Sequence, residues 1–245
     1  MTSWTDIGTN RSQGTRAAGI AGVLAAVALA GEFLFFSLSG FQQASFADPA
    51  SALSFLRDHG LFVRVAVLFG AAGVGLTLIF LTGLAARLRP TAPTLSLATL
   101  YFGIVGNVGD GLVALSFWIG IPMFVDLAGR QATAAQNAWP AFGAITGGYQ
   151  AFGNLFLGLS LLAAGWAAVS TRSLPRVLGA IAIVAGLSAL ASVLVASAQV
   201  GFVLAVALVI VFRAWAGIDL IRGEKVSVND RPGEAARAAS RRVAS

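Results

Sequence analysis

Seven polar or charged side chains lie inside long apolar stretches of this sequence, and their chemistry is the first feature that needs an explanation. They are Glu32, Arg64, Asn107, Asp110, Thr146, Gln150 and Asn154. An ionisable group inside a bilayer costs about 2.5–3.5 kcal/mol on insertion scales, so such residues usually face a partner or a cavity. Carboxyl groups there can hold or relay protons, whereas amides and hydroxyls can bind a ligand or a neighbouring helix. We therefore treat these residues as a candidate polar cavity.

The spacing of these residues predicts a shared interior. Asn107 and Asp110 are three residues apart, so they share one face of a helix. Thr146, Gln150 and Asn154 recur every four residues and form a polar stripe. At about 1.5 Å per residue, most of these groups fall within roughly 10 Å of the membrane midplane, on its outer side. The pattern predicts a polar chamber that is closed towards the cytoplasm and could open outward.

Two interpretations of this chamber stay open. In the functional one, it is a binding cavity or half of a transport or proton path, with Glu32 and Asp110 as its acids. In the structural one, the acids are protonated or paired with Arg64, and the amides join helices through hydrogen bonds. We favour the structural interpretation because polar contacts between membrane helices are common.

Other features of the apolar stretches have structural explanations. Arg213 and Asp219 are expected near the inner boundary, where snorkelling of the side chains accounts for them. Gly143 and Gly147 form a small-xxx-small pair that predicts close helix packing. The third apolar stretch is also rich in glycine, for which we expect the same role: Gly103, Gly106, Gly109 and Gly111.

The residue inventory argues against an enzyme and against a metal or cofactor site. The chain has no cysteine and one histidine, His59, which excludes thiolate and multi-histidine metal sites. Gly109-Asp110 is close to the Gly-x-Gly-Asp motif of intramembrane aspartyl proteases, but Asn107 replaces the first glycine. These proteases also need a second aspartate in a Tyr-Asp pair, whereas the second acid at this depth here is Glu32. We predict no catalytic residue, no metal and no cofactor.

Composition and hydropathy predict the elements that position these residues. The chain has 245 residues, 57% of them hydrophobic and 11% charged, whereas a soluble domain carries about 25% charged residues. The mean hydropathy is +0.83. The expected fold is an all-α membrane bundle of about six helices, each long enough to cross a hydrocarbon core about 30 Å thick. The expected spans are residues 17–36, 61–85, 95–121, 141–169, 177–196 and 201–220.

Prolines and capping residues predict where helices begin and end. Pro122 marks the expected end of the third span, and the fourth opens after Trp139 and Pro140. In the loop at residues 41–60, Asp48 and Pro49 predict the start of a short helix that Gly60 ends. The boundary between the fifth and sixth spans, near residues 197–200, is weakly marked. Residues 1–16 are expected as a cytoplasmic segment, and residues 222–245 as a basic, disordered cytoplasmic tail.

The distribution of basic residues predicts the orientation of the chain. Of its 16 Lys and Arg, the outer segments hold Arg57, Arg64 and Arg130, and Arg213 lies within a span; the remaining 12 flank the inner side. Both ends are therefore expected in the cytoplasm. This placement also explains the net charge of +6 without nucleic-acid binding. The first span has some features of a signal peptide, including Ala28-Leu29-Ala30, but its apolar run continues to Phe36, which favours retention.

Several short motifs resemble those of a known family. Asp48-Pro49 is followed by a leucine-containing segment to Phe62, a span that closes in Leu88-Arg89-Pro90, and an apolar third span. In this order they resemble the domain-of-unknown-function 4386 family of small bacterial membrane proteins, over about residues 16–222. The resemblance implies a six-span protein of the bacterial inner membrane with no established activity, and it supplies no catalytic residue.

The sequence thus predicts an integral membrane protein of uncharacterised molecular function. We expect a structural, sensor or accessory role, with a small transporter or ligand-binding protein as the alternative. The expected partners are the lipid bilayer and either a second copy or a membrane protein that packs through helices.

Overall fold

The protein is a bundle of six long helices. The computed structural model describes residues 4–40, 48–194 and 199–229. The helices are α1 (Trp4–Leu38), α2 (Pro49–Leu88), α3 (Pro93–Arg130), α4 (Ala132–Thr171), α5 (Arg176–Leu194) and α6 (Gln199–Asn229). The described residues contain no strand. The expected all-α class is confirmed.

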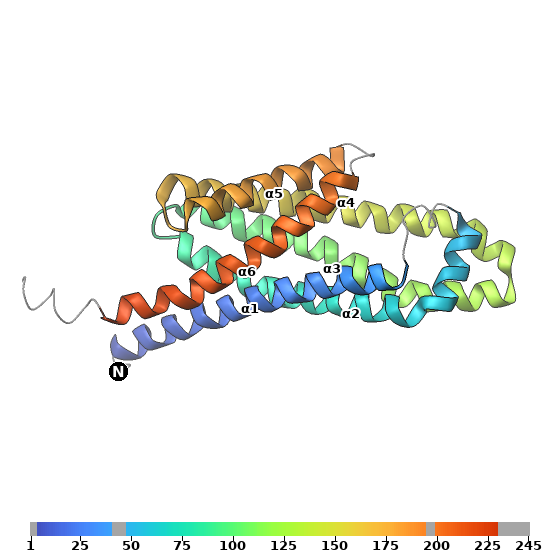
Figure 1. The fold of residues 1–245 in the computed structure, drawn as a ribbon, viewed down its shortest axis with the longest axis horizontal. Coiled ribbons are helices and arrows are strands. Elements are labelled where there is room, and N and C mark those ends of the chain that lie inside the picture. Colours follow the sequence, from blue (N-terminus) through green and yellow to red (C-terminus); the bar gives the residue numbers. More distant parts are fainter. Residues whose placement is uncertain (1–3, 41–47, 195–198, 230–245) are drawn as a thin grey trace, which may run out of the picture.

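All six helices contain a stretch long and apolar enough to cross a membrane, so the chain is a multi-pass membrane protein. Each helix packs against the next along the chain, and α6 packs back against α1, which closes a ring. The helix α2 also contacts α4 and α6, so it occupies the centre of the bundle. The start of α1 and the end of α6 lie side by side at one end (Figure 1). We name this the terminal end.

At the opposite end, which we name the hairpin end, α3 and α4 extend beyond α1 and α5 (Figure 1). The helices α2, α3 and α4 have 38–40 residues, or about 57–60 Å, which is twice the hydrocarbon thickness. The excess length forms an apolar core at the hairpin end. Its buried residues are Ala52, Leu53, Leu56, Val63, Ile121, Ala135 and Trp139.

The short helix predicted before the second span is present as the first part of α2. Asp48 is its N-cap and accepts a hydrogen bond from the backbone N–H of Ser51 at 3.0 Å, and Pro49 occupies the first turn. A break at His59 (φ −118°, ψ 15°) separates it from the span. The break lies one residue before the predicted Gly60. This segment crosses the ends of α3 and α4 and covers the apolar core there (Figure 1).

The predicted helix ends at Pro122 and Pro140 were wrong. The helix α3 continues through Pro122 to Arg130, and α4 begins at Ala132 and contains Pro140. A proline removes one helical hydrogen bond, but aromatic packing holds the two helices together at this level. The Phe124 ring lies 5.3 Å from the ring of Trp139 and 5.1 Å from that of Phe142, measured between centroids.

The outermost helices are longer than expected. The helix α1 begins at Trp4, within the predicted N-terminal segment, and it packs along α2 and α6 as a retained span would. The helix α6 runs to Asn229, so the first part of the predicted tail is helical. Residues 230–245, the rest of that tail, lie outside the described residues. The predicted boundary near residues 197–200 falls largely outside them as well.

Glycines allow three pairs of helices to approach backbone to backbone. A Cβ at Gly106 would lie 2.6 Å from the backbone nitrogen of Leu157 in α4. A Cβ at Gly165 would lie 2.7 Å from the carbonyl oxygen of Gly179 in α5, and one at Gly19 would lie 2.6 Å from that of Gly217 in α6. The predicted packing role is thus confirmed for glycine in α3. Gly143 and Gly147 face open space within this chain, so no helix of the same chain takes up the packing role predicted for them.

Candidate functional site

Three charged side chains from three helices meet in the middle of the bundle. Glu32 comes from α1, Asp110 from α3 and Arg213 from α6, and Arg213 attracts both carboxylates electrostatically. Among the described residues, no nitrogen of Arg213 lies within the 4.0 Å of an ion pair with either acid. The attraction therefore acts over more than 4.0 Å, across the low-dielectric interior of the bundle. We name these three residues the charge cluster.

Glycines on neighbouring helices make room for both acids. A Cβ at Gly70 of α2 would lie 3.0 Å from the carboxylate Oε1 of Glu32. A Cβ at Gly153 of α4 would lie 2.6 Å from Oδ1 of Asp110. Each carboxylate therefore lies against bare backbone of the adjacent helix, at a position where any side chain would collide with it.

Arg213 was misplaced by the sequence analysis, which assigned it to the inner boundary. Its side chain belongs to the buried interior, with only 6% of the residue exposed. The candidate span of α6 covers Gly201–Gly223, so about 15 Å of helix separates Arg213 from Gly223. That distance is too long for the side chain to reach the boundary. The position of Arg213 near the centre of an apolar run was the sequence signal that could have revealed its burial.

Arg64 is not a member of the charge cluster, although it was the predicted partner of the acids. It is exposed, one turn after the break at His59, while its neighbour Val63 is fully buried. Because Val63 points into the bundle, Arg64 points away from it. The expected pairing of the acids with Arg64 was therefore wrong, and Arg213 takes that place.

The polar side chains predicted in the third and fourth spans form separate contacts. Asn107 is buried and donates a hydrogen bond from Nδ2 to the carbonyl oxygen of Val74 in α2, at 2.7 Å. Gln150 donates to Asn154 at 3.4 Å, and Asn154 donates to Ser192 of α5 at 3.4 Å. Thr146 bonds to the Phe142 carbonyl oxygen of its own helix, at 3.0 Å.

These contacts divide the predicted chamber into separate parts. Asn107 joins α3 to α2 beside the charge cluster, and Asn154 joins α4 to α5. A small cavity within the bundle does lie next to Arg213, but it is displaced from Glu32 and Asp110 towards the terminal end. Its volume is about 20 Å³, which suits one water molecule and no organic ligand.

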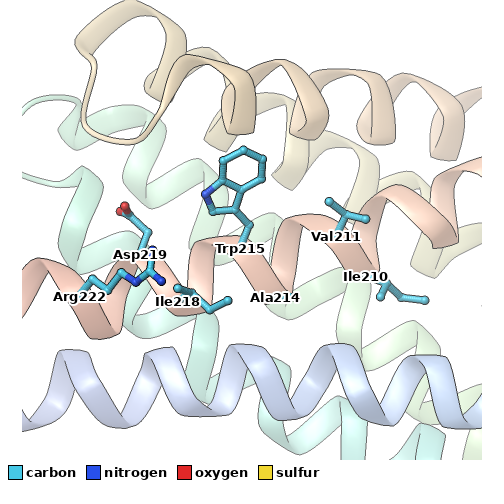
Figure 2. Close-up of a pocket in the computed structure, with 7 residues that line it drawn as sticks. All are labelled: Ile210, Val211, Ala214, Trp215, Ile218, Asp219 and Arg222. Carbon is cyan, nitrogen blue, oxygen red and sulfur yellow. The ribbon is translucent and has the colours of Figure 1, made fainter.

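A larger, open groove of about 480 Å³ lies on the surface of α6 (Figure 2). Trp215 points towards α5, and Ile210 lies on the side nearer to α1. Asp219 and Arg222 line the groove near the terminal end, consistent with the expected boundary position of Asp219.

The histidine and the acids offer no further site. His59 stacks on Phe55 of its own helix, with 4.8 Å between ring centroids, and its Nδ1 lies 3.3 Å from the Phe55 carbonyl oxygen. In the part of the chain that the structure describes, no group of three or more His, Cys, Asp or Glu side chains could hold a metal ion.

Comparison with protein families gives one match. The family model described as Domain of unknown function (DUF4386) matches residues 17–222. That range covers all six candidate spans except the first residues of α1 and the end of α6. Neither the curated proteins nor the solved structures include a significant match.

Proposed function

Because the chain belongs to the DUF4386 family, whose function is unknown, we propose its function from the site: a non-enzymatic structural or accessory protein of the bacterial plasma membrane. In this role the charge cluster determines how α1, α3 and α6 are arranged. The protein then presents a fixed helical surface to lipid and to other membrane proteins.

One observation carries this proposal: three charged residues on three helices interact electrostatically inside the bundle, next to a cavity with room for a single water. A buried charge is tolerated when it faces an opposite charge, and each wrong arrangement of helices would leave a charge in lipid. The cluster therefore favours one helix order over others. A transport pathway would need space beside Glu32 and Asp110, whereas the cavity next to Arg213 lies further towards the terminal end.

The double variant Glu32→Gln with Asp110→Asn tests this role. If the cluster is structural, the double variant leaves Arg213 without a counter-charge, so the purified variant should unfold more easily in detergent than the natural chain. Vesicles that contain the natural chain should show no proton or solute flux. A variant that folds as well as the natural chain, but loses a flux that the natural chain has, would contradict the proposal.

A small proton-linked transporter is the second candidate, and the charge balance favours it. The cluster holds two carboxyl groups and one guanidinium, so one carboxylate needs a proton or a bound cation for neutrality. A proton flux into vesicles that Asp110→Asn abolishes, while folding is retained, would support this candidate over the structural one.

For orientation, we propose that both termini face the cytoplasm. The support is the concentration of Lys and Arg at the terminal end, among them Arg87, Arg89, Arg172, Arg176 and Arg222, under the positive-inside rule. Alkaline phosphatase fused after Ser245 should be inactive, and a fluorescent protein fused there should fluoresce. An active phosphatase would reverse the orientation.

For partners, we propose that a second copy packs against α4 through Gly143 and Gly147. The support is that a Cβ at either position meets no atom within 4 Å in one chain, and small residues allow close helix contact. The chain lacks cysteine, so a single Ala144→Cys variant can be oxidised in membranes to test this contact. A disulfide-linked dimer is expected, and Gly147→Leu should abolish it; a chain that stays monomeric contradicts the pairing.

A further inference from the structure

The small cavity beside Arg213 is lined mainly by apolar surface but has polar side chains on several sides. It lies between α2, α3, α4 and α6 and has a volume of about 20 Å³. Four of its lining residues carry polar side chains: Thr77, Thr99, Ser160 and Arg213. The remaining lining is apolar, including Phe80 and Phe212. These polar side chains can hold a water in a pocket of this size, which a packing defect lined by apolar groups alone would not.

The Thr77 hydroxyl has no hydrogen-bond partner in the protein. Only 3% of the residue is exposed, and Thr77 Oγ1 is the one buried side-chain oxygen without a partner among the described residues. Other threonines of the bundle bond to their own helix, as Thr99 does to the Leu95 carbonyl oxygen at 2.8 Å. Thr77 does not, and it lines the cavity. Buried hydroxyls are costly unless something else bonds to them.

The other polar groups complement Thr77 in donors and acceptors. The Ser160 hydroxyl donates to the Thr99 carbonyl oxygen at 2.7 Å, and the Thr99 hydroxyl donates to Leu95. Both hydroxyl oxygens therefore still have lone pairs that can accept a hydrogen bond. The guanidinium of Arg213 can only donate. Together these groups match a small molecule that both donates and accepts.

We propose that this cavity is a binding site for one water molecule, held by the Thr77 hydroxyl and the Arg213 guanidinium. A water needs roughly 10–15 Å³ and two to four polar partners, and the cavity supplies both. The bound water gives Arg213 a hydrogen-bond partner on the side away from Glu32 and Asp110. The buried cation is then stabilised from two directions. This inference does not rest on the proposed structural function.

The nearly isosteric substitution Thr77→Val tests the site through the sign of its effect. With a bound water, the variant loses one of the contacts that hold it, and the thermal midpoint of the purified chain in detergent should fall by about 2–4 °C. Without a water, the variant removes an unpaired hydroxyl from an apolar interior, and the midpoint should rise. A midpoint that rises or stays unchanged overturns the proposal.

Thr146→Val is the matched control. Thr146 is also buried, but its hydroxyl bonds to its own helix, and about 21 Å of α4 separates it from Ser160, which lines the cavity. Its effect should be clearly smaller than that of Thr77→Val, and equal effects contradict a site at Thr77. A density map that shows ordered waters gives a second, direct readout. A peak in contact with Thr77 Oγ1 and Arg213 is expected, and its absence would refute the site.

Discussion

Asn107 of α3 donates a hydrogen bond to the main-chain carbonyl oxygen of Val74 in α2 at 2.7 Å, one helical turn from Asp110. The bond fixes α3 against the central helix at the level where the acid enters the bundle. Val74 is already part of a helix, so the amide uses the second lone pair of its carbonyl oxygen. Asn107 is therefore a positioning residue for Asp110.

Asn107→Ala should destabilise the bundle because it removes this contact between helices. Hydrogen bonds between membrane helices contribute about 0.6–1.7 kcal/mol, and we expect a loss near the upper value. The measurement is unfolding of the purified chain by increasing mole fractions of dodecyl sulfate. Asn154→Ala is the comparison, because its bond to Ser192 is longer, at 3.4 Å. An equal or larger loss for Asn154→Ala would argue against the special role of Asn107.

Gly106→Ala should lower the free energy of unfolding by about 1–3 kcal/mol, because its methyl group meets backbone that cannot move aside. The nearest atom is the Leu157 nitrogen at 2.6 Å. Gly75→Ala, whose methyl group meets no atom within 4 Å, should leave the free energy unchanged or raise it by up to about 1 kcal/mol through helix propensity. If the two variants behave alike, the close approach of α3 and α4 is not as described.

The cap of α2 gives a prediction about pH. The side-chain hydroxyl of Ser51, together with its backbone N–H, lowers the pKa of Asp48 below its ordinary value of 3.8. A carboxyl group whose folded pKa is lowered contributes its stability above the unfolded pKa and loses it as pH falls through the folded pKa. At neutral pH the cap is thus intact.

Asp48→Ala should therefore increase amide hydrogen exchange in the first turn of α2 at pH 7. The difference from the natural chain should shrink below about pH 3.8 and vanish once the pH is below the lowered pKa of the folded protein. Ser51→Ala should give a smaller increase, because it removes the hydroxyl and keeps the backbone donor. A difference between Asp48→Ala and the natural chain that persists unchanged at low pH would mean that the ionised carboxylate does not cap the helix.

Much of the fold was predictable because lipid imposes a simple requirement on length. Six apolar runs of about 20 residues predict six helices, and Asp48-Pro49 predicts the start of the short helix in α2. Helix ends at proline were not predictable. Pro122 and Pro140 stay within helices, where Phe124 and Trp139 beside them pack against each other across α3 and α4, a contact that local sequence rules do not reveal.

The candidate site was only partly predictable, for a related reason. Glu32, Asn107 and Asp110 stand out because they are polar in apolar runs, and in the structure Asn107 is buried while the two acids are half-buried. Arg213 stands out in the same way, but the neighbouring sequence does not indicate which helix it faces. Helices that are apolar on all sides carry no amphipathic stripe that reveals the order of the bundle. The closure of α6 against α1 decides that Arg213, and not Arg64, meets the acids.

The coupling energy between Asp110 and Arg213 tests the central role of the charge cluster most directly. It is obtained from the unfolding free energies of the natural chain, Asp110→Asn, Arg213→Gln and the double variant, with Arg64→Gln as the control. Arg213→Gln should cost about 3–5 kcal/mol, because it leaves two acids buried without a counter-charge, and Arg64→Gln should change stability by less than about 0.5 kcal/mol. The double variant should be more stable than the sum of the single losses by at least about 1 kcal/mol. Losses that add simply, or an Arg64→Gln variant as damaged as Arg213→Gln, would contradict the account.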